Sequence, residues 1–325
     1  MFACMPPRGD KLGVKLLRAS ACLLACGLAA ACGGAGVARE EAAARDYSTG
    51  THVVLLGTGT PNAEPDRAGA ALAVVVNGNA YLVDAGPGIV RRANGARDLG
   101  VEALAPSRLE IVFLTHLHTD HTVGLPDLIF TPWVLERSTP LAVYGPPGTE
   151  AMTRYLTAAY EEDVRTRLEG LEPANPMGHR VEAHEIEAGV VFENQDVRVT
   201  AFPVRHGSWE VALGYRFESA DRTVVLSGDA APSETIVEFC SGCDVLVHEV
   251  YSQAGFERRE PVWQAYHSRF HTSSLELAEL AARAQPGLLV LTHQLLWGSS
   301  PEELVAEIEG AWPGDVRYGR DLDIY

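Results

Sequence analysis

The segment Thr115-His116-Leu117-His118-Thr119-Asp120-His121 places four potential metal ligands within six residues. It directly follows the apolar run 111–114, whose composition predicts a buried strand. A loop that leaves a strand can point alternate side chains the same way. The first two histidines can therefore bind one cation while Asp120 and His121 face another. This mixture of imidazole and carboxylate suits Zn²⁺, Mn²⁺ or Fe better than Ca²⁺ or Mg²⁺.

Three further candidate ligands follow later apolar runs, each of which is predicted to be a strand. They are His206 after the run 197–202, Asp229 after 223–226, and His293 after 288–292. This recurrence argues against a histidine-rich surface loop with no function. The sequence therefore predicts a metal centre built where strands end.

Short apolar runs and helical patterns alternate through the rest of the chain. Strands are also expected at 52–57, 71–76, 81–84, 141–144, 190–192, 213–217 and 245–250. Helices are expected at 87–99, 152–168, 232–239, 273–284 and 301–309. Hairpins mixed with βα units favour one large α/β domain with two sheets between helices. Loops around 60–70, 130–140, 207–212 and 251–265 are expected to wall the cleft.

The composition of the 325 residues is that of a globular protein, with 46% hydrophobic and 21% charged residues. Lys and Arg number 26 against 43 Asp and Glu, so the formal net charge is −17. A surface this acidic repels a polyphosphate instead of releasing its counterions. Nucleic acid is therefore not an expected partner.

The first residues are predicted to be a signal peptide. Four basic residues precede the apolar run 19–31, which is too short to span a bilayer. The run ends at Cys32 in a pattern that resembles a bacterial lipoprotein cleavage site. We therefore expect a signal at 1–31, a tether at 32–50 and a hydrolase domain at 51–325, exported and lipid-anchored on the periplasmic side. The alternatives are processing at Cys26, an ordinary signal cut near Ala38 that gives a secreted or soluble periplasmic protein, and an uncleaved anchor.

Cys240 and Cys243 are the cysteines that remain in the body of the chain. Their Cys-Ser-Gly-Cys spacing could indicate a redox dithiol or half of a zinc site. No second pair completes four thiolates, and no thioredoxin-like βαβ pattern surrounds them. A small loop-closing disulfide is therefore favoured in an oxidising compartment.

With these motifs described, the chain resembles the metallo-β-lactamase fold over about residues 51–325. The most specific motif is His-x-His-x-Asp-His at 116–121, preceded by Asp84-Ala-Gly-Pro-Gly88. Ser-Gly-Asp229, His248-Glu249 and Thr-His293 are most similar to the ribonuclease Z-like branch of metal-dependent phosphodiesterases. The resemblance implies an α/β fold of four layers, an αββα sandwich.

The resemblance also implies a site with two divalent ions, most simply Zn²⁺, with Mn²⁺ or Fe as alternatives. It assigns the ligands as follows: His116, His118 and His206 on one ion, Asp120, His121 and His293 on the other, and Asp229 as the bridge. Asp84 resembles the family's structural aspartate under the metal loop, where it would orient ligands. Two ions about 3.5–4 Å apart can hold a bridging hydroxide that attacks a phosphoryl or acyl ester.

His271 resembles the family's separate catalytic histidine, which would protonate the leaving group, and Glu249 resembles the carboxylate that orients it. Asp120 joins them in the expected catalytic set. A structural role for His271 stays open, because Thr272 to Ser274 also resembles a helix cap. His248 could equally be a packed core residue.

Other aromatic and basic residues receive weaker assignments. Trp209 and Trp297 follow site motifs closely enough to line the cleft, whereas Trp263 is expected in the core or at the rim. Arg67 is a candidate contact for phosphate or carboxylate. Four histidines are expected to lie outside the site: His52, His179, His184 and His267.

The chain departs from the ribonuclease pattern. That family carries a long arm that grips transfer RNA between its Gly-Tyr-Arg and Ser-Gly-Asp strands, and only residues 216–226 separate Tyr215 from Ser227 here. The family's lysine is also absent from the loop 65–69. A small phosphodiester or related ester is therefore the expected substrate. Lactonase or β-lactamase activity and a non-hydrolytic metal-binding lipoprotein are the alternatives, and a homodimer is left open.

Overall fold

The structure is a computed structural model that describes residues 46–325. The predicted signal peptide, both candidate processing cysteines and most of the tether lie outside the described residues. No helix among residues 46–325 is both long enough and apolar enough to cross a membrane.

The first sheet is formed by the amino-terminal half of the chain. Its strands lie in chain order: β1 (Thr51–Gly57), β2 (Ala71–Val76), β3 (Asn79–Val83), β4 (Ile111–Phe113), β5 (Leu141–Gly145) and β6 (Val181–Glu185). The first three strands are antiparallel, and β3 to β6 run parallel.

The second sheet is formed by the carboxyl-terminal half, in the spatial order β13-β12-β11-β10-β9-β8-β7. Its strands are β7 (Gly189–Glu193), β8 (Val197–Val204), β9 (Ala212–Ser219), β10 (Thr223–Leu226), β11 (Val245–Tyr251), β12 (Leu288–Leu295) and β13 (Val316–Tyr318). The strands β10 to β13 are parallel, and β7 to β10 are antiparallel.

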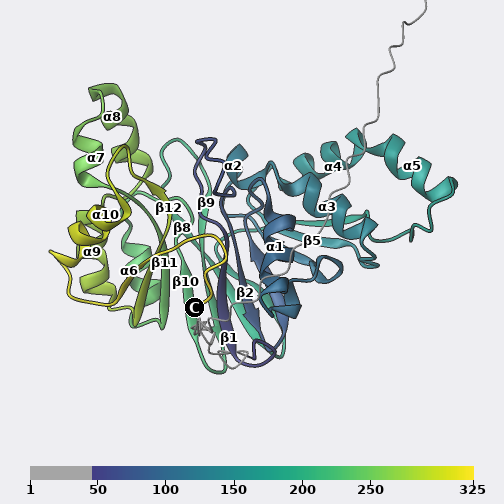
Figure 1. Cartoon of the computed structure of the whole chain (residues 1–325), viewed down its shortest axis with the longest axis horizontal. Helices are drawn as coiled ribbons and strands as arrows, with labels where there is room; N and C mark the ends of the chain where they lie inside the picture. The colour runs from purple at the N-terminus through teal and green to yellow at the C-terminus, as the bar shows by residue number, and fades with distance from the viewer. Residues whose placement is uncertain (1–45) are drawn as a thin grey trace, which may run out of the picture. The chain divides into compact units, whose positions relative to one another are not determined.

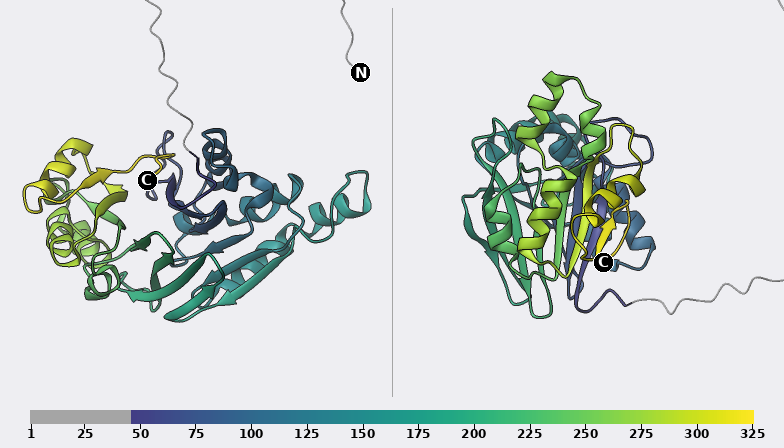
Figure 2. Two further views of the ribbon diagram at one scale, coloured as in Figure 1. Left: turned by 90° about the horizontal axis from the view of Figure 1, so that it is seen from below. Right: turned by 90° about the vertical axis from the view of Figure 1, so that its left-hand side faces the viewer.

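Helices cover the outer face of each sheet, as Figures 1 and 2 show. The helices α1 (Ile89–Asp98) and α3 (Leu125–Val134) cover the first sheet, and α6 (Glu234–Cys240), α9 (Ser274–Ala284) and α10 (Pro301–Glu309) cover the second. The remaining helices are α2 (Thr119–Thr122), α4 (Thr149–Ala159), α5 (Glu161–Glu169), α7 (Gln253–Glu257) and α8 (Pro261–Phe270), with two 3₁₀ turns, Glu102–Leu104 and Pro106–Arg108.

Strand alternation explains the layers. Successive side chains of a strand point to opposite faces. Val53 and Leu55 of β1 therefore join the apolar cluster between the two sheets, whereas Val54 and Leu56 join the cluster under α1 and α3. A third cluster lies between the second sheet and α6, α9 and α10. Three buried clusters separate four layers, and the predicted αββα sandwich is confirmed.

Some of the expected secondary structure is wrong. The single helix expected at 152–168 is two helices, α4 and α5, because the chain turns at Tyr160, whose ring packs on Phe130 at 4.6 Å. The strand β6 was not predicted, because its sequence Val-Glu-Ala-His-Glu is polar and largely solvent-facing. The expected loop 251–265 largely forms α7 and α8, and residues 130–134 of the expected loop 130–140 belong to α3.

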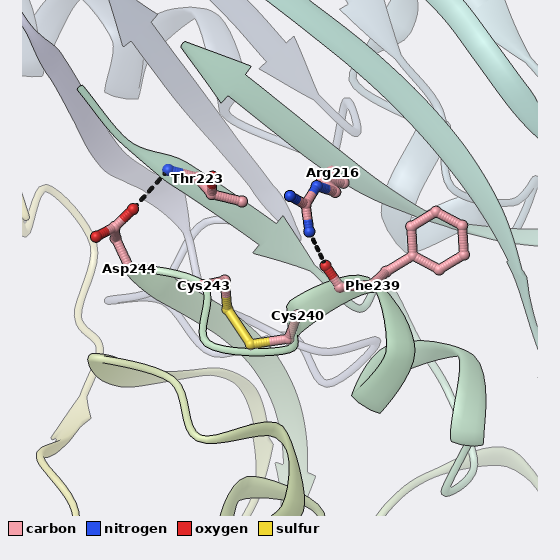
Figure 3. The surroundings of a disulfide bond; sticks show 6 residues. All are labelled: Arg216, Thr223, Phe239, Cys240, Cys243 and Asp244. Carbon is pink, nitrogen blue, oxygen red and sulfur yellow. Dashed lines mark hydrogen bonds between the residues drawn. A yellow bond between two sulfur atoms is a disulfide. The ribbon is translucent and has the colours of Figure 1, made fainter. Parts of the chain in front are cut away.

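The predicted disulfide between Cys240 and Cys243 is present (Figure 3). It closes the turn between α6 and β11, which is also held by Asp244, whose carboxylate accepts the backbone N–H of Thr223 at 2.7 Å. The guanidinium of Arg216 donates to the Phe239 carbonyl on the other side. This turn precedes β11, so the disulfide lies at the amino ends of the parallel strands.

Arg137 is fully buried, although its side chain is charged. Its guanidinium donates to the carbonyls of Leu109, Leu128, Ile129 and Gly178 at 2.7–2.9 Å. The Leu128 carbonyl needs this donor, because Pro132 stands four residues later in α3 and has no N–H. Burial lowers the pKa of Arg137 to about 10, so the group stays charged at neutral pH.

We predict that Arg137→Met lowers the free energy of unfolding by roughly 2–5 kcal/mol, because buried carbonyls lose a charged donor. Urea unfolding followed by circular dichroism measures this loss. The control is Arg165→Met on the exposed surface of α5, which should change the free energy by less than about 1 kcal/mol. Equal stability of the two variants would contradict the prediction.

Candidate metal centre

The seven predicted ligands all lie where strands of both sheets end. His116 and His118 follow β4, and Asp120 and His121 lie on α2. His206 follows β8, Asp229 follows β10, and His293 lies near the end of β12. Their ligand atoms form overlapping groups within 4.8 Å of one another. The carboxyl ends of strands from two sheets therefore share one centre.

The first group contains three imidazoles whose nitrogens converge. The Nδ1 atom of His118 lies 2.9 Å from Nε2 of His116 and 3.1 Å from Nε2 of His206. The other nitrogen of His206 donates to the Phe270 carbonyl at 2.8 Å, which directs its Nε2 atom toward the group. Trp209, expected near the cleft, lies against His118, with its indole nitrogen 2.8 Å from Nε2.

The second group contains both carboxylates. Nε2 of His293 lies 3.2 Å from the Asp120 carboxylate and 3.6 Å from that of Asp229. Nε2 of His121 lies 3.3 Å from Asp229. Asp229 also lies 3.8 Å from Nε2 of His206 in the first group. Asp229 thus touches ligands of both groups, as a bridging carboxylate must.

Asp84 supports this loop from beneath. Its carboxylate accepts the backbone N–H of Thr115 at 2.8 Å and the Thr115 hydroxyl at 2.9 Å. The same carboxylate accepts Nδ1–H of His121 at 2.7 Å. That bond leaves Nε2 of His121 free to face a cation, which is the way a second carboxylate fixes the tautomer of a ligand histidine.

Two residues of the centre have strained backbone. Asp84 has φ +59° and His293 has φ +44°, and non-glycine residues adopt such angles only where surrounding structure enforces them. His293 is the extra residue of a β-bulge, because Glu249 pairs with Thr292 and Val250 pairs with Gln294. A bulge changes the direction of a side chain, and here it turns His293 toward Asp120.

The electrostatics of these residues fit bound cations. Burial opposes protonation of His121, but Asp229 and Asp84 raise its pKa well above the usual value. Burial likewise opposes protonation of His293, whose pKa Asp229 and Asp120 raise. Nε2 of His121 and Nδ1 of His293 are buried without hydrogen-bond partners. The chain therefore holds positive charge on imidazoles beside two buried carboxylates, and divalent cations can replace those protons.

His271 and Glu249 form a buried pair beside the ligands. Nδ1 of His271 lies 3.3 Å from Oε2 of Glu249, and Oε1 of Glu249 accepts the backbone N–H of Thr272 at 2.9 Å. Burial raises the pKa of Glu249 well above its usual range, and Asp229 adds to the effect. Burial also lowers the pKa of His271 to about 4. Both shifts favour the uncharged form of each group.

The cap motif after His271 is also present. Ser273 and Glu276 form a capping box at the start of α9. The helix is therefore capped by the serine and not by the imidazole, and His271 lies on the wall of a cavity together with Asp120, Asp229 and His293. The position of His271 fits the expected proton donor.

Two weaker candidates lie outside the cavity. His248 is fully buried, and its Nδ1–H donates to the backbone carbonyl of Glu249, so it is a packed core residue. Arg67 was a candidate for substrate contact, but its guanidinium is committed to Thr58, Glu64 and Gln294. The structure therefore does not support a substrate role for Arg67.

The cavity has a volume of about 480 Å³ and one aromatic side. We call this side the aromatic wall, and it consists of Arg259, Trp263, Tyr266, His267 and Trp297. The sequence placed Trp297 and the segment 251–265, which includes Arg259 and Trp263, at the cleft, and it placed His267 outside the site. The residues Trp263, Tyr266 and His267 follow a helical spacing in α8, a signal hidden by the expectation of a loop.

The chain matches the family model described as a beta-lactamase superfamily domain over residues 79–294. It is 35% identical over 274 residues to a protein of Mycobacterium sp. (strain KMS) named ribonuclease Z, covering 83% of this chain and 94% of that protein. A ribonuclease Z of Mycobacterium bovis (strain BCG / Pasteur 1173P2) is 34% identical over 284 residues, covering 83% and 96%.

Solved structures share the fold. The metallo-β-lactamase fold protein YhfI of Bacillus subtilis aligns with a TM-score of 0.65 at 17% identity, over 85% of this chain and 98% of that one. The short form of human tRNase Z aligns with a TM-score of 0.58 at 21% identity, over 84% and 98%. The ribonuclease names of these proteins are at odds with the expectation that nucleic acid is not a partner.

We predict that Asp84→Asn lowers the affinity for Zn²⁺ by roughly 10- to 100-fold. The amide has a single acceptor oxygen, and its NH₂ group cannot accept the hydrogen bonds that the second carboxylate oxygen receives from Thr115 or His121. Titration with zinc against a competing chelator measures the affinity. The control is Asp98→Asn at the exposed end of α1, which should leave it unchanged. An unchanged affinity in Asp84→Asn would contradict the supporting role of this carboxylate.

Proposed function

This chain belongs to the beta-lactamase superfamily as a metal-dependent phosphodiester hydrolase related to ribonuclease Z, and we propose that its substrate is a small phosphodiester. The proposal includes two metal ions per chain, Zn²⁺ by preference, and export of the protein as a lipoprotein.

The short connection between β9 and β10 is the observation that most favours a small substrate. Glu218 of β9 pairs with Thr223 of β10, and the turn between them is closed by a hydrogen bond from Ser219 N–H to the Arg222 carbonyl at 3.0 Å. The family resemblance places the arm that grips transfer RNA at this connection. A turn of residues 220–222 offers no such arm, and the net charge of −17 disfavours a polyanion.

The cavity supports the same choice. Its volume of about 480 Å³ lies in the range of sites that enclose a small molecule. The ligands His116, His118 and His206 would hold one ion, and Asp120, His121 and His293 the other, with Asp229 between them. When bound, these ions would activate water and stabilise negative charge on the phosphoryl oxygens.

The leaving alcohol then needs a proton. His271 lies on the cavity wall with Nδ1 toward Glu249, so its Nε2–H can be donated to the leaving oxygen. In its protonated form, which burial favours, Glu249 can pass a proton to Nδ1 as Nε2–H is given up. The imidazole is then neutral again, and Glu249 is ionised with two backbone N–H groups, of Thr272 and Ala230, to stabilise its charge.

A substrate screen tests the proposal. Purified protein loaded with zinc would be offered bis(p-nitrophenyl) phosphate, a precursor transfer RNA with a 3′ extension, an aryl lactone and a β-lactam. We expect hydrolysis of the phosphodiester and none of the RNA. Cleavage of the RNA at a rate comparable to that of the diester would overturn the choice of substrate, and activity on the lactone or β-lactam alone would support the alternative hydrolases.

We predict that His271→Ala keeps both metal ions and slows hydrolysis by roughly 10²–10⁴-fold, the usual contribution of a positioned proton donor. The loss should be largest for methyl phenyl phosphate and smallest for methyl p-nitrophenyl phosphate, whose leaving group needs little protonation. Steady-state kinetics and elemental analysis provide the measurements. His116→Ala is the comparison, since it should lose metal and fail on both substrates. Equal losses on both esters in His271→Ala, with metal retained, would assign His271 to substrate positioning.

We predict that Cys32→Ser blocks lipid attachment and releases the protein from the membrane fraction, because Cys32 ends the apolar run of the signal. Metabolic labelling with a fatty acid and membrane fractionation measure both effects. Cys26→Ser is the matched control and should remain acylated. A wild-type protein that is unacylated and begins near Glu40 would instead support the ordinary signal peptide.

A further inference from the structure

Arg259 of the aromatic wall is held by two indole rings. Its guanidinium carbon lies 5.6 Å from the ring centre of Trp263 and 5.4 Å from that of Trp297. Trp297 also packs on His267 at 4.4 Å. Stacking on aromatic rings fixes the plane of a guanidinium and leaves the N–H groups at its edge free to donate.

These donors have no acceptor within the part of the chain that the structure describes. The Nε atom of Arg259 is buried and has no hydrogen-bond partner, and the residue forms no ion pair there. Arginines elsewhere in this acidic protein commonly face carboxylates, as in Arg283 with Glu234 at 2.8 Å and Arg167 with Asp163 at 3.0 Å. A buried donor without a partner costs free energy unless a ligand supplies the acceptor.

The guanidinium belongs to the same cavity as the metal ligands. Asp120 and Asp229 line one side of this cavity, and Arg259 lines the aromatic wall. The ring of His271 lies between these sides, 5.8 Å from the ring of His293 and 5.6 Å from that of His267. Because His271 would protonate the leaving oxygen, a leaving alcohol can extend from this point along the aromatic wall toward Arg259.

We propose that Arg259 is a binding site for a second anionic group on the leaving alcohol of the substrate. The substrate class is therefore a phosphodiester whose leaving group has an apolar or aromatic body and carries a carboxylate or phosphate. The aromatic wall packs against that body, and Arg259 binds the anion through its edge N–H groups. This inference rests on the proposed phosphodiesterase function.

Matched esters test the charge requirement directly. Methyl 4-carboxyphenyl phosphate carries the second anion, and methyl 4-carbamoylphenyl phosphate is its neutral counterpart of nearly the same shape. The 3-substituted pair tests a second position of the charge. In the zinc-loaded protein we expect kcat/KM to be roughly 10- to 100-fold higher for the carboxylate of at least one pair, which corresponds to a hydrogen bond to a charged group.

Variants assign this preference to Arg259. Arg259→Gln should abolish the preference, because the neutral amide of glutamine cannot pair with the anion, so that kcat/KM for the carboxylate falls to about that of the neutral ester in the same variant. The matched control is Arg269→Gln on the exposed side of α8, which should keep the preference. Circular dichroism and metal content confirm that each variant is folded and loaded. No preference for either carboxylate in the wild type, or a preference that survives in Arg259→Gln, would overturn the proposal.

A binding measurement separates this inference from the proposed function. Isothermal titration calorimetry compares 4-hydroxybenzoate with 4-hydroxybenzamide, the two leaving alcohols, in wild type and Arg259→Gln. We expect the benzoate to bind more tightly, and only in the wild type. Selective binding without hydrolysis of any ester would remove the hydrolase function and keep the anion site. Hydrolysis without selective binding of the benzoate would keep the hydrolase function and remove the anion site.

Discussion

The carboxylate of Asp84 joins the end of β3 to the start of the loop that carries four of the candidate ligands. It accepts both donors of Thr115 and the Nδ1–H of His121, and the residue adopts φ +59° to do so. The following segment lies against α2, since Ala85 N–H donates to the His121 carbonyl at 2.7 Å. A Cβ at Gly86 would come within 2.6 Å of the Asp120 carbonyl, so only glycine permits this approach.

The same contact determines the charge of the centre. Two carboxylates, Asp120 and Asp229, are buried among imidazoles, and buried charges require partners of the opposite sign. Without cations the protonated His121 and His293 provide that charge, which keeps the pKa of Asp229 well below its usual value despite burial. Metal binding must displace these protons, and Asp84 retains the remaining N–H of His121. The hydrogen bonds of Asp84 therefore both support the loop and influence its affinity for cations.

Short-range patterns of apolar residues in the sequence were sufficient to predict most of the strands. Short apolar runs gave most strands of both sheets, and the ends of four of these strands located the candidate ligands. Residues with no apolar periodicity, such as those of β6, were missed. The contacts of Arg137 were also beyond the sequence, because its four acceptors come from three separate segments. The aromatic wall was predicted only in part, through the segment 251–265 and Trp297, for a related reason: His267 and Trp297 are 30 positions apart and meet only when α8 packs beside the end of β12.

The candidate metal ligands and the aromatic wall of the cavity come from different segments of this fold. The ligands lie at strand ends and on a β-bulge, where two packed sheets fix their positions. The β9–β10 turn and the helices α7 and α8 lie between strands and contribute no candidate ligand. A relative can therefore share the metal centre and the name ribonuclease Z while its substrate depends on segments that contribute no ligand. In this chain the β9–β10 connection is a short turn, and α8 contributes to an aromatic wall that includes one unpaired guanidinium among the described residues that line the cavity. The aromatic wall shapes what fits into the cavity and contributes none of the candidate ligands.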